Sequence, residues 1–240
     1  MSERGATERV GAHWARFLGV APDDLSRPGI VVTPHAALGS WLGVWCFTRG
    51  ESCVISAAPA WIARLRDRAA NTGARDAARC VELALGAATE RSVGPSYQGW
   101  LAPEGFTPVR SDDVRQLAPE EGGALETVRD AAAPGEWDHS GIVSDRPPTW
   151  AAFAGAKVCA LGQLRSQAAA VSDPCVIAHP RSRGAGCGTR VVSAMCEHAL
   201  SQGALVLYQT LLTNSPALAI ARRLGFEHYA TLVAFRLRSV

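Results

Sequence analysis

Three glycines stand at alternate positions directly before an apolar stretch. The segment "HPRSRGAGCGTRVVSAM" (residues 179–195) contains Gly184, Gly186 and Gly188. Each would weaken the interior of a helix or strand by roughly 0.5–1 kcal/mol relative to alanine, so such a run is typical of backbone that a ligand approaches closely. Because the first N–H groups of a helix lack intrahelical partners and lie at the positive end of its dipole, we expect an anionic ligand.

Two common phosphate-binding motifs do not fit this loop. The dinucleotide-binding motif G-x-G-x-x-G, counted from Gly184, requires a glycine where the chain has Thr189. The nucleoside-triphosphate motif G-x-x-x-x-G-K-[ST] requires a lysine, and Lys157 is the only lysine of the chain. The loop is therefore expected to bind its anion in another way.

The elements around the loop alternate between strands and helices. Hydrophobic periodicity and the Gly and Pro positions predict a short strand, a helix, a hairpin, a strand, the loop, a helix, a strand, a helix and a final strand. The corresponding residues are 113–117, 119–132, 149–166, 168–179, the loop with the helix after it, 204–210, 215–225 and 226–240. Ser215 is expected to cap the last helix. This order predicts an α/β (α+β) fold: a mixed, mostly antiparallel central sheet flanked by helices.

A segment rich in glycine, proline and polar residues (94–113) is typical of a linker. It predicts a small N-terminal α+β domain over 1–107 and a second domain over 108–240. The N-terminal half is predicted to hold helices near 7–18, 60–70 and 75–85, and strands near 29–33, 42–47 and 52–56. Its role stays open between shaping a binding pocket, dimerisation and being a degenerate second copy of the same kind of domain.

Composition excludes several functional classes. A net charge of +2 and 48% hydrophobic residues favour neither nucleic acid nor a membrane surface as a partner. The N-terminus has no apolar signal-like stretch, and the seven cysteines form no CxxC motif, so we expect reduced, buried thiols in a cytoplasmic protein. The six histidines have no metal-ligand spacing, and no metal is expected.

The loop resembles the pyrophosphate-binding signature of GNAT-type N-acetyltransferases. Residues 183–188, "RGAGCG", match the pattern [RQ]-x-x-G-x-[GA], and Asn214 with the later "ALAIARRLGF" resembles the family's late Asn-plus-helix motif. The resemblance covers roughly residues 108–240. It implies the GNAT fold and acetyl-CoA as the acyl donor.

The resemblance also implies roles for individual residues. Backbone N–H groups of the loop would hold the pyrophosphate of coenzyme A, and a strand edge before the loop would pair with the pantetheine amides and polarise the thioester carbonyl. Two helix positions and the preceding Asn would contact the cofactor arm or its phosphates. The residues are Arg183, Gly184, Ala185, Gly186, Cys187, Gly188 and Thr189 for the loop, Val176, Ile177 and Ala178 for the edge, and Asn214, Ala217 and Arg222 for the rest.

The catalytic residues follow the family pattern less closely. Many relatives place a tyrosine seven residues after the Asn as general acid, and here that position is Ala221. Tyr229 is predicted as a substitute, with Tyr208 or solvent as alternatives. Asp173 is predicted as general base, although "SDP" is also typical of a bulge or turn. The cluster "GEWDHSG" lies where a substrate loop would be, so Glu136, Asp138 and His139 are predicted to bind the acceptor.

These residues favour an acetyl-CoA-dependent N-acetyltransferase that acts on a small-molecule amine, in a possible homodimer. Two alternatives remain open. One is a non-catalytic GNAT-like module that binds coenzyme A or a partner, which Ala221 supports. The other is an acyltransferase that uses another acyl-CoA or an alcohol acceptor.

Overall fold

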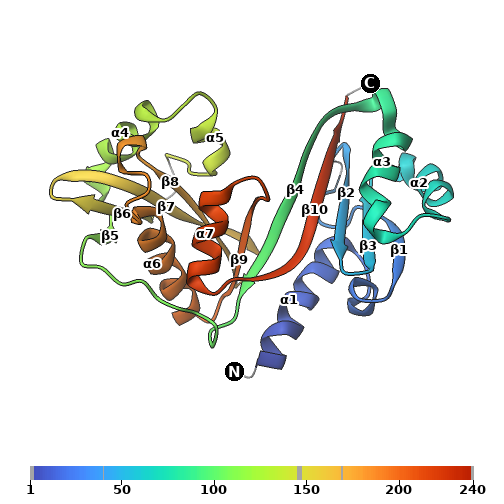
Figure 1. Cartoon of the computed structure of the whole chain (residues 1–240), viewed down its shortest axis with the longest axis horizontal. Helices are drawn as coiled ribbons and strands as arrows, with labels where there is room; N and C mark the ends of the chain where they lie inside the picture. The colour runs from blue at the N-terminus through green and yellow to red at the C-terminus, as the bar shows by residue number, and fades with distance from the viewer. Residues whose placement is uncertain (1–2, 40, 145–147, 169, 239–240) are drawn as a thin grey trace. The chain divides into compact units, whose positions relative to one another are not determined.

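The computed structural model describes residues 3–39, 41–144, 148–168 and 170–238 (Figure 1). The chain divides into two compact units. The first comprises Met1–Gly99, Gln209–Asn214 and His228–Val240, and the second comprises Trp100–Tyr208 and Ser215–Glu227. Each unit thus combines segments that are far apart in the sequence. The sequence instead predicted one boundary, between residues 107 and 108, and that boundary stays a prediction.

The first unit contains a sheet with strand order β1-β3-β2-β10-β4. β1 runs parallel to β3, while β2 is antiparallel to both β3 and β10. The predicted helices and strands of this half are confirmed. Their bounds are α1 Glu3–Leu18, β1 Gly29–Pro34, β2 Gly43–Arg49, β3 Ser52–Ala57, α2 Ile62–Ala69, α3 Ala77–Leu85, β4 Thr89–Leu101 and β10 Glu227–Leu237.

The linker predicted over 94–113 is wrong in its first part. Residues 94–101 belong to β4, a strand of 13 residues. The last five residues of β4 are buried, although glycine and proline precede them. A strand in a sheet satisfies its backbone groups through its neighbours, and this outweighs the local turn propensity.

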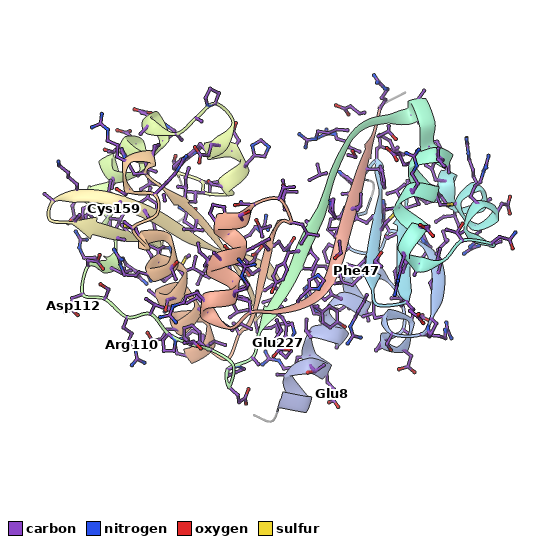
Figure 2. All side chains as sticks on the ribbon, viewed as in Figure 1. Glu8, Phe47, Arg110, Asp112, Cys159 and Glu227 are labelled. Atoms are coloured by element: carbon purple, nitrogen blue, oxygen red, sulfur yellow. The ribbon has the colours of Figure 1, made fainter. Side chains whose placement is uncertain are left out.

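Helices cover both faces of the first sheet. On one face Trp14 of α1 packs on Phe47 of β2, with ring centroids 4.7 Å apart (Figure 2 labels Phe47), and Phe17 stacks on Trp45. Since side chains alternate along a strand, the intervening residues face the opposite way. They form a second core with α2 and α3, which includes Val44, Cys46, Ile55, Leu65, Val81 and Leu85.

The second unit contains strands in the order β9-β8-β7-β6-β5. The pairs among β5, β6, β7 and β8 are antiparallel, and β8 is parallel to β9. Helices flank these strands, so the predicted fold class is confirmed. The bounds are β5 Val114–Gln116, α4 Gly123–Ala131, α5 Glu136–Ser140, β6 Thr149–Ala154, β7 Lys157–Ala168, β8 Val171–Ala178, α6 Cys187–Ser201, β9 Leu205–Leu211 and α7 Ser215–Leu224.

α4 and α6 lie on opposite faces of β7 and β8 (Figure 1). On the α4 face, Leu161 packs among residues that include Val128 and Ile177. On the α6 face, a Cβ at Gly162 would lie 2.5 Å from Val191 Cγ1 and from Met195 Cε. The glycine on β7 therefore lets α6, which follows the glycine loop, approach the sheet closely.

The Leu-Gly-Phe sequence after α7 has a structural reason. Gly225 has φ +89°, and a Cβ there would lie 2.0 Å from the carbonyl oxygen of Gly105. Phe226 donates its N–H to Ala221 at 2.9 Å, and its buried ring packs 5.0 Å from that of Tyr208. Only glycine fits this helix end.

The cysteines are mostly buried, as the composition predicts. The seven cysteines form no disulfide among the described residues, and six of them are buried. In the part of the chain that is described, no helix has both the length and the apolar character that crossing a membrane requires. No cluster of three or more His, Cys, Asp or Glu side chains suited to a metal ion occurs there either.

Candidate cofactor-binding site

β8 and β9 pair over only two residues. Among the described residues their ladder consists of Val171↔Leu205 and Ser172↔Val206. On its other side, β8 stays paired with β7 as far as Ala178↔Ala160. The end of β8, from Val176 to Ala178, therefore continues beyond the described ladder with β9. The pairing of this edge with pantetheine stays a prediction. Backbone groups at such an edge can pair with an extended ligand.

The glycine loop follows β8 directly. A single 3-10 turn, Pro180–Ser182, leads to Gly184 with φ +79° and Gly186 with φ +76°. A Cβ at Gly184 would meet nothing within 4 Å, so the left-handed backbone, rather than lack of space in the protein, explains this glycine. Gly188 differs, because a Cβ there would make only ordinary contacts of 3.5 Å to Ile220 and 3.7 Å to Val176. The protein around Gly188 therefore has room for a side chain. Close approach by a ligand stays the predicted reason for this glycine.

The loop ends at the N-terminus of α6, a helix of 15 residues. Gly186 occupies the N-cap position, and no acidic side chain stands in the first turn. The N–H groups of Cys187, Gly188 and Thr189 therefore have no partner within the helix and no carboxylate from their own turn. With the positive end of the helix dipole, they form a site suited to an anion.

A residue predicted to bind the cofactor contacts a residue predicted to bind the acceptor. Arg183 of the loop donates to Glu136 of α5 at 2.5 Å, and Glu136 also accepts the N–H of Ala133 at 3.0 Å. Desolvation tends to raise the pKa of Glu136, but the hydrogen bonds from Ala133 and Arg183 outweigh it and lower the pKa below its usual value. The cluster "GEWDHSG", predicted as a loop, is in fact the short helix α5, in which Asp138 is exposed and His139 bonds the carbonyl of Gly135.

A second ion pair beneath the loop was not predicted from the sequence. Arg190, in the first turn of α6, contacts Asp113 Oδ2 at 2.8 Å and the carbonyl oxygen of Ala185 at 3.1 Å. The only sequence signal was the arginine itself, because a cation is unfavourable at a helix N-terminus unless other groups compensate it. Its partner lies 77 residues earlier in the chain, which local patterns do not reveal.

Asp173, the predicted base, lies in a regular part of β8. It pairs in register with Arg165 of β7, so the turn or bulge that "SDP" allowed is wrong at this position. Its side chain is 3% exposed and forms an ion pair with Arg165, whose own side chain is 43% exposed. The neighbouring guanidinium favours the charged carboxylate. Its role as base stays a prediction.

The residues predicted around the usual tyrosine position belong to different units. Ala221 is buried in α7 of the second unit, whereas Tyr229 belongs to the first unit, where the Arg49 guanidinium lies 4.6 Å from its ring centroid. Burial raises the pKa of Tyr229 although Arg49 opposes this, so the phenol is protonated at neutral pH. Tyr208, on β9, is also buried.

The Asn-plus-helix motif is only partly as predicted. α7 starts at Ser215, so Asn214 takes the N-cap position that the sequence assigned to Ser215. Asn214 and Arg222 are exposed, and Ala217 is half-buried. Their predicted contacts with the cofactor stay predictions.

Residues 161–234 match the family model of FR47-like proteins. The structure is similar to a GNAT-family acetyltransferase from Colwellia psychrerythraea, with a TM-score of 0.51 and 19% identity over 66% of this chain and 61% of that one. It is also similar to a putative GNAT-family acetyltransferase from Novosphingobium aromaticivorans, with a TM-score of 0.50 and 16% identity over 63% of this chain and 67% of that one. No curated protein sequence matches significantly.

The chain thus spans 61% of the length of the Colwellia protein. The FR47-like match begins on β7 and ends on β10, so it includes the divergent strand β8, the glycine loop and the Leu-Gly-Phe helix end. Sequence match and fold agree, and the resemblance to the GNAT-type acetyltransferases is confirmed.

Proposed function

We propose that the chain transfers an acetyl group from acetyl-CoA to an amine of a small molecule. One observation carries the proposal: β8 leaves its ladder with β9 and runs into a left-handed glycine loop at the N-terminus of a long helix. This places an open strand edge and an anion site in succession along the chain. A ligand with an amide-containing arm and a pyrophosphate fits that order.

The residues present fit acetyl-CoA in kind. First-turn N–H groups of α6 would bind the pyrophosphate, and the edge of Val176, Ile177 and Ala178 would pair with the pantetheine amides. Acetyl-CoA, when bound, supplies an acetyl group activated as a thioester. Backbone N–H groups at the β8 edge would stabilise the negative charge that develops on its carbonyl oxygen during attack by the amine.

Two proton transfers have to be served by side chains or solvent. Asp173, which forms an ion pair with Arg165, is the proposed base that takes a proton from the acceptor ammonium before the amine attacks. Tyr229 is the proposed acid for the departing thiolate, with Tyr208 as alternative, and burial keeps the phenol of Tyr229 neutral. Glu136, Asp138 and His139 of α5 are proposed to bind the acceptor, and two carboxylates favour a cationic amine. A homodimer in the cytoplasm, without a nucleic-acid or membrane partner, completes the proposal.

A non-catalytic module that binds coenzyme A is the second candidate. Ala221, where relatives carry the general acid, is fully enclosed in the core of the second unit. A chain that binds acetyl-CoA but releases no coenzyme A with any amine would have this function. Transfer of another acyl group, or transfer to an alcohol, would instead appear as release with a different donor or acceptor.

The binding test uses the left-handed glycines. Asparagine tolerates φ > 0 better than other residues with a side chain, so Gly186→Asn should keep the loop conformation while adding a side chain at the anion site. Gly203→Asn is the matched control, because Gly203 has φ +71° and open space at the other end of α6. We expect calorimetry to show weak acetyl-CoA binding for Gly186→Asn and unchanged binding for Gly203→Asn. Equal affinities in the two folded variants would contradict the placement of the pyrophosphate.

A further inference from the structure

Arg190 extends from the first turn of α6 back beneath the glycine loop. Its guanidinium contacts three groups: the carbonyl oxygen of Ala185 at 3.1 Å, Cys187 Sγ at 3.5 Å and Asp113 Oδ2 at 2.8 Å. Because a cation at the positive end of a helix is unfavourable, these contacts have to compensate its position. Arg190 is therefore held by the loop and by Asp113 together.

Asp113 connects this arginine to the sheet. The carbonyl of Asp113 accepts the N–H of Phe153 in β6 at 2.9 Å, and the next residue, Val114, begins β5 in register with Ala152. Desolvation tends to raise the pKa of Asp113, but the hydrogen bonds from Ser111 and Arg190 and the charge of Arg190 outweigh it. The pKa therefore lies below its usual value, and the carboxylate is charged at neutral pH. The side chains of Arg190 and Asp113 are only 23% and 29% exposed, and their charges offset each other.

The contact with Ala185 fixes the direction of one peptide group. In a trans peptide the C=O and the following N–H point to opposite sides. Since the carbonyl of Ala185 is turned toward Arg190, the N–H of Gly186 is turned away from it. Gly186, the second residue of this peptide unit, has positive φ, and glycine backbone also permits the opposite orientation, in which the carbonyl would face an incoming anion.

We propose that Arg190, held by Asp113, is a positioning residue that keeps the Ala185–Gly186 peptide in its anion-binding orientation. The inference rests on the proposed function, since it assigns the anion to the pyrophosphate of acetyl-CoA. It differs from a role of Arg190 as a direct phosphate ligand. A ligand role predicts that removing the charge of Asp113 frees the arginine and strengthens binding, whereas a positioning role predicts weaker binding.

The experiment measures the affinity of three ligands by calorimetry: acetyl-CoA, inorganic pyrophosphate and S-acetylpantetheine, which lacks the pyrophosphate. Arg190→Met removes the donors and keeps much of the length, Arg190→Lys keeps the charge, and Asp113→Asn removes the anchor. Arg129→Met on α4 is the control, since the Arg129 side chain pairs only with its neighbour Asp130 in the described structure. Thermal unfolding of each variant reports its stability separately.

We expect Arg190→Met to raise the Kd of acetyl-CoA and of pyrophosphate about tenfold, the size of one lost charged hydrogen bond. Arg190→Lys should recover part of this affinity, and Asp113→Asn should weaken both ligands about threefold or more, because the arginine loses its anchor. S-acetylpantetheine should bind all variants equally. The inference would be overturned if Arg190→Lys bound acetyl-CoA no better than Arg190→Met, or if Arg190→Met bound S-acetylpantetheine as weakly as it binds acetyl-CoA. Either result would mean that Arg190 has only a general structural role.

Unchanged binding in Arg190→Met, or tighter binding in Asp113→Asn, would also overturn it. Failure of the proposed function gives a different result. If the wild type binds pyrophosphate in an Arg190-dependent way but does not bind acetyl-CoA, the assignment of the cofactor is wrong and the positioning role stands. If the wild type binds neither ligand, both fail.

Discussion

Replacing Glu136 by glutamine is expected to strengthen the binding of acetyl-CoA. Glu136 is the counter-ion of Arg183 of the loop, at 2.5 Å. An arginine that pairs with a carboxylate has to leave it before it can pair with a pyrophosphate. Glu136→Gln removes the competing charge, keeps the length of the side chain and keeps an oxygen that can accept the N–H of Ala133.

The exposure of the pair limits the size of the gain. The side chains of Arg183 and Glu136 are 50% and 33% exposed, so the pair has the character of a surface ion pair. Such pairs contribute about 0–1 kcal/mol, which corresponds to at most about a fivefold lower Kd for acetyl-CoA. Because the screening length falls from about 10 Å at 0.1 M salt to about 3 Å at 1 M, the gain should shrink as salt is added.

Calorimetry at low and high salt tests this with a double-mutant cycle. Arg183→Gln should weaken acetyl-CoA binding, and in that background Glu136→Gln should bring no gain, since the competing pair no longer exists. Glu126→Gln on α4, an exposed glutamate, controls for the general effect of removing one negative charge. Weaker binding in Glu136→Gln, or an equal gain in the Arg183→Gln background, would refute the competition. Acceptor kinetics of the same variant measure separately whether Glu136 also binds the amine.

Two further predictions concern stability. Burial, assisted by the charge of Arg16, lowers the pKa of His13 to about 4 from an ordinary value of 6.5, so the unfolded chain binds the proton more readily between these values. Stability should therefore fall as pH is lowered from 6.5 toward 4, and urea titrations of His13→Phe should show a smaller fall over that window. Gly225→Ala should destabilise by about 2 kcal/mol or more, because φ is +89° and its Cβ would overlap the carbonyl of Gly105 at 2.0 Å. Wild-type denaturant midpoints in that variant would show that the helix end tolerates a side chain.

The sequence was informative wherever local physics decides the structure. Periodicity located α6 and the loop before it, because an amphipathic face and an N-terminal glycine run are local signals. The apolar stretch before the loop likewise located β8, whose ladder with β9 ends at Ser172 among the described residues. These features depend on residues within about one turn or one strand of each other.

What the sequence could not show depends on distant partners. β4 was hidden because Gly94 and Pro95 are typical of turns, and only the strands beside it make this segment a strand. The pairs Arg183–Glu136 and Arg190–Asp113 join residues 47 and 77 positions apart. They depend on the placement of α5 beside β8 and of β5 beside α6, which no local spacing encodes.

The place of β10 in the first sheet has a consequence for synthesis of the chain. β10 pairs with β2 from Thr231↔Thr48 to Arg236↔Gly43, and it also neighbours β4, so the sheet of the first unit lacks a central strand until residue 237 has been made. At typical ribosomal rates, the roughly 130 residues after β4 take on the order of ten seconds to synthesise. During that time β2 presents an open hydrogen-bonding edge, which is a template for pairing with other chains. The first unit therefore stays open to pairing with other chains until synthesis is nearly finished, and an N-terminal fragment that lacks β10 would keep that edge exposed.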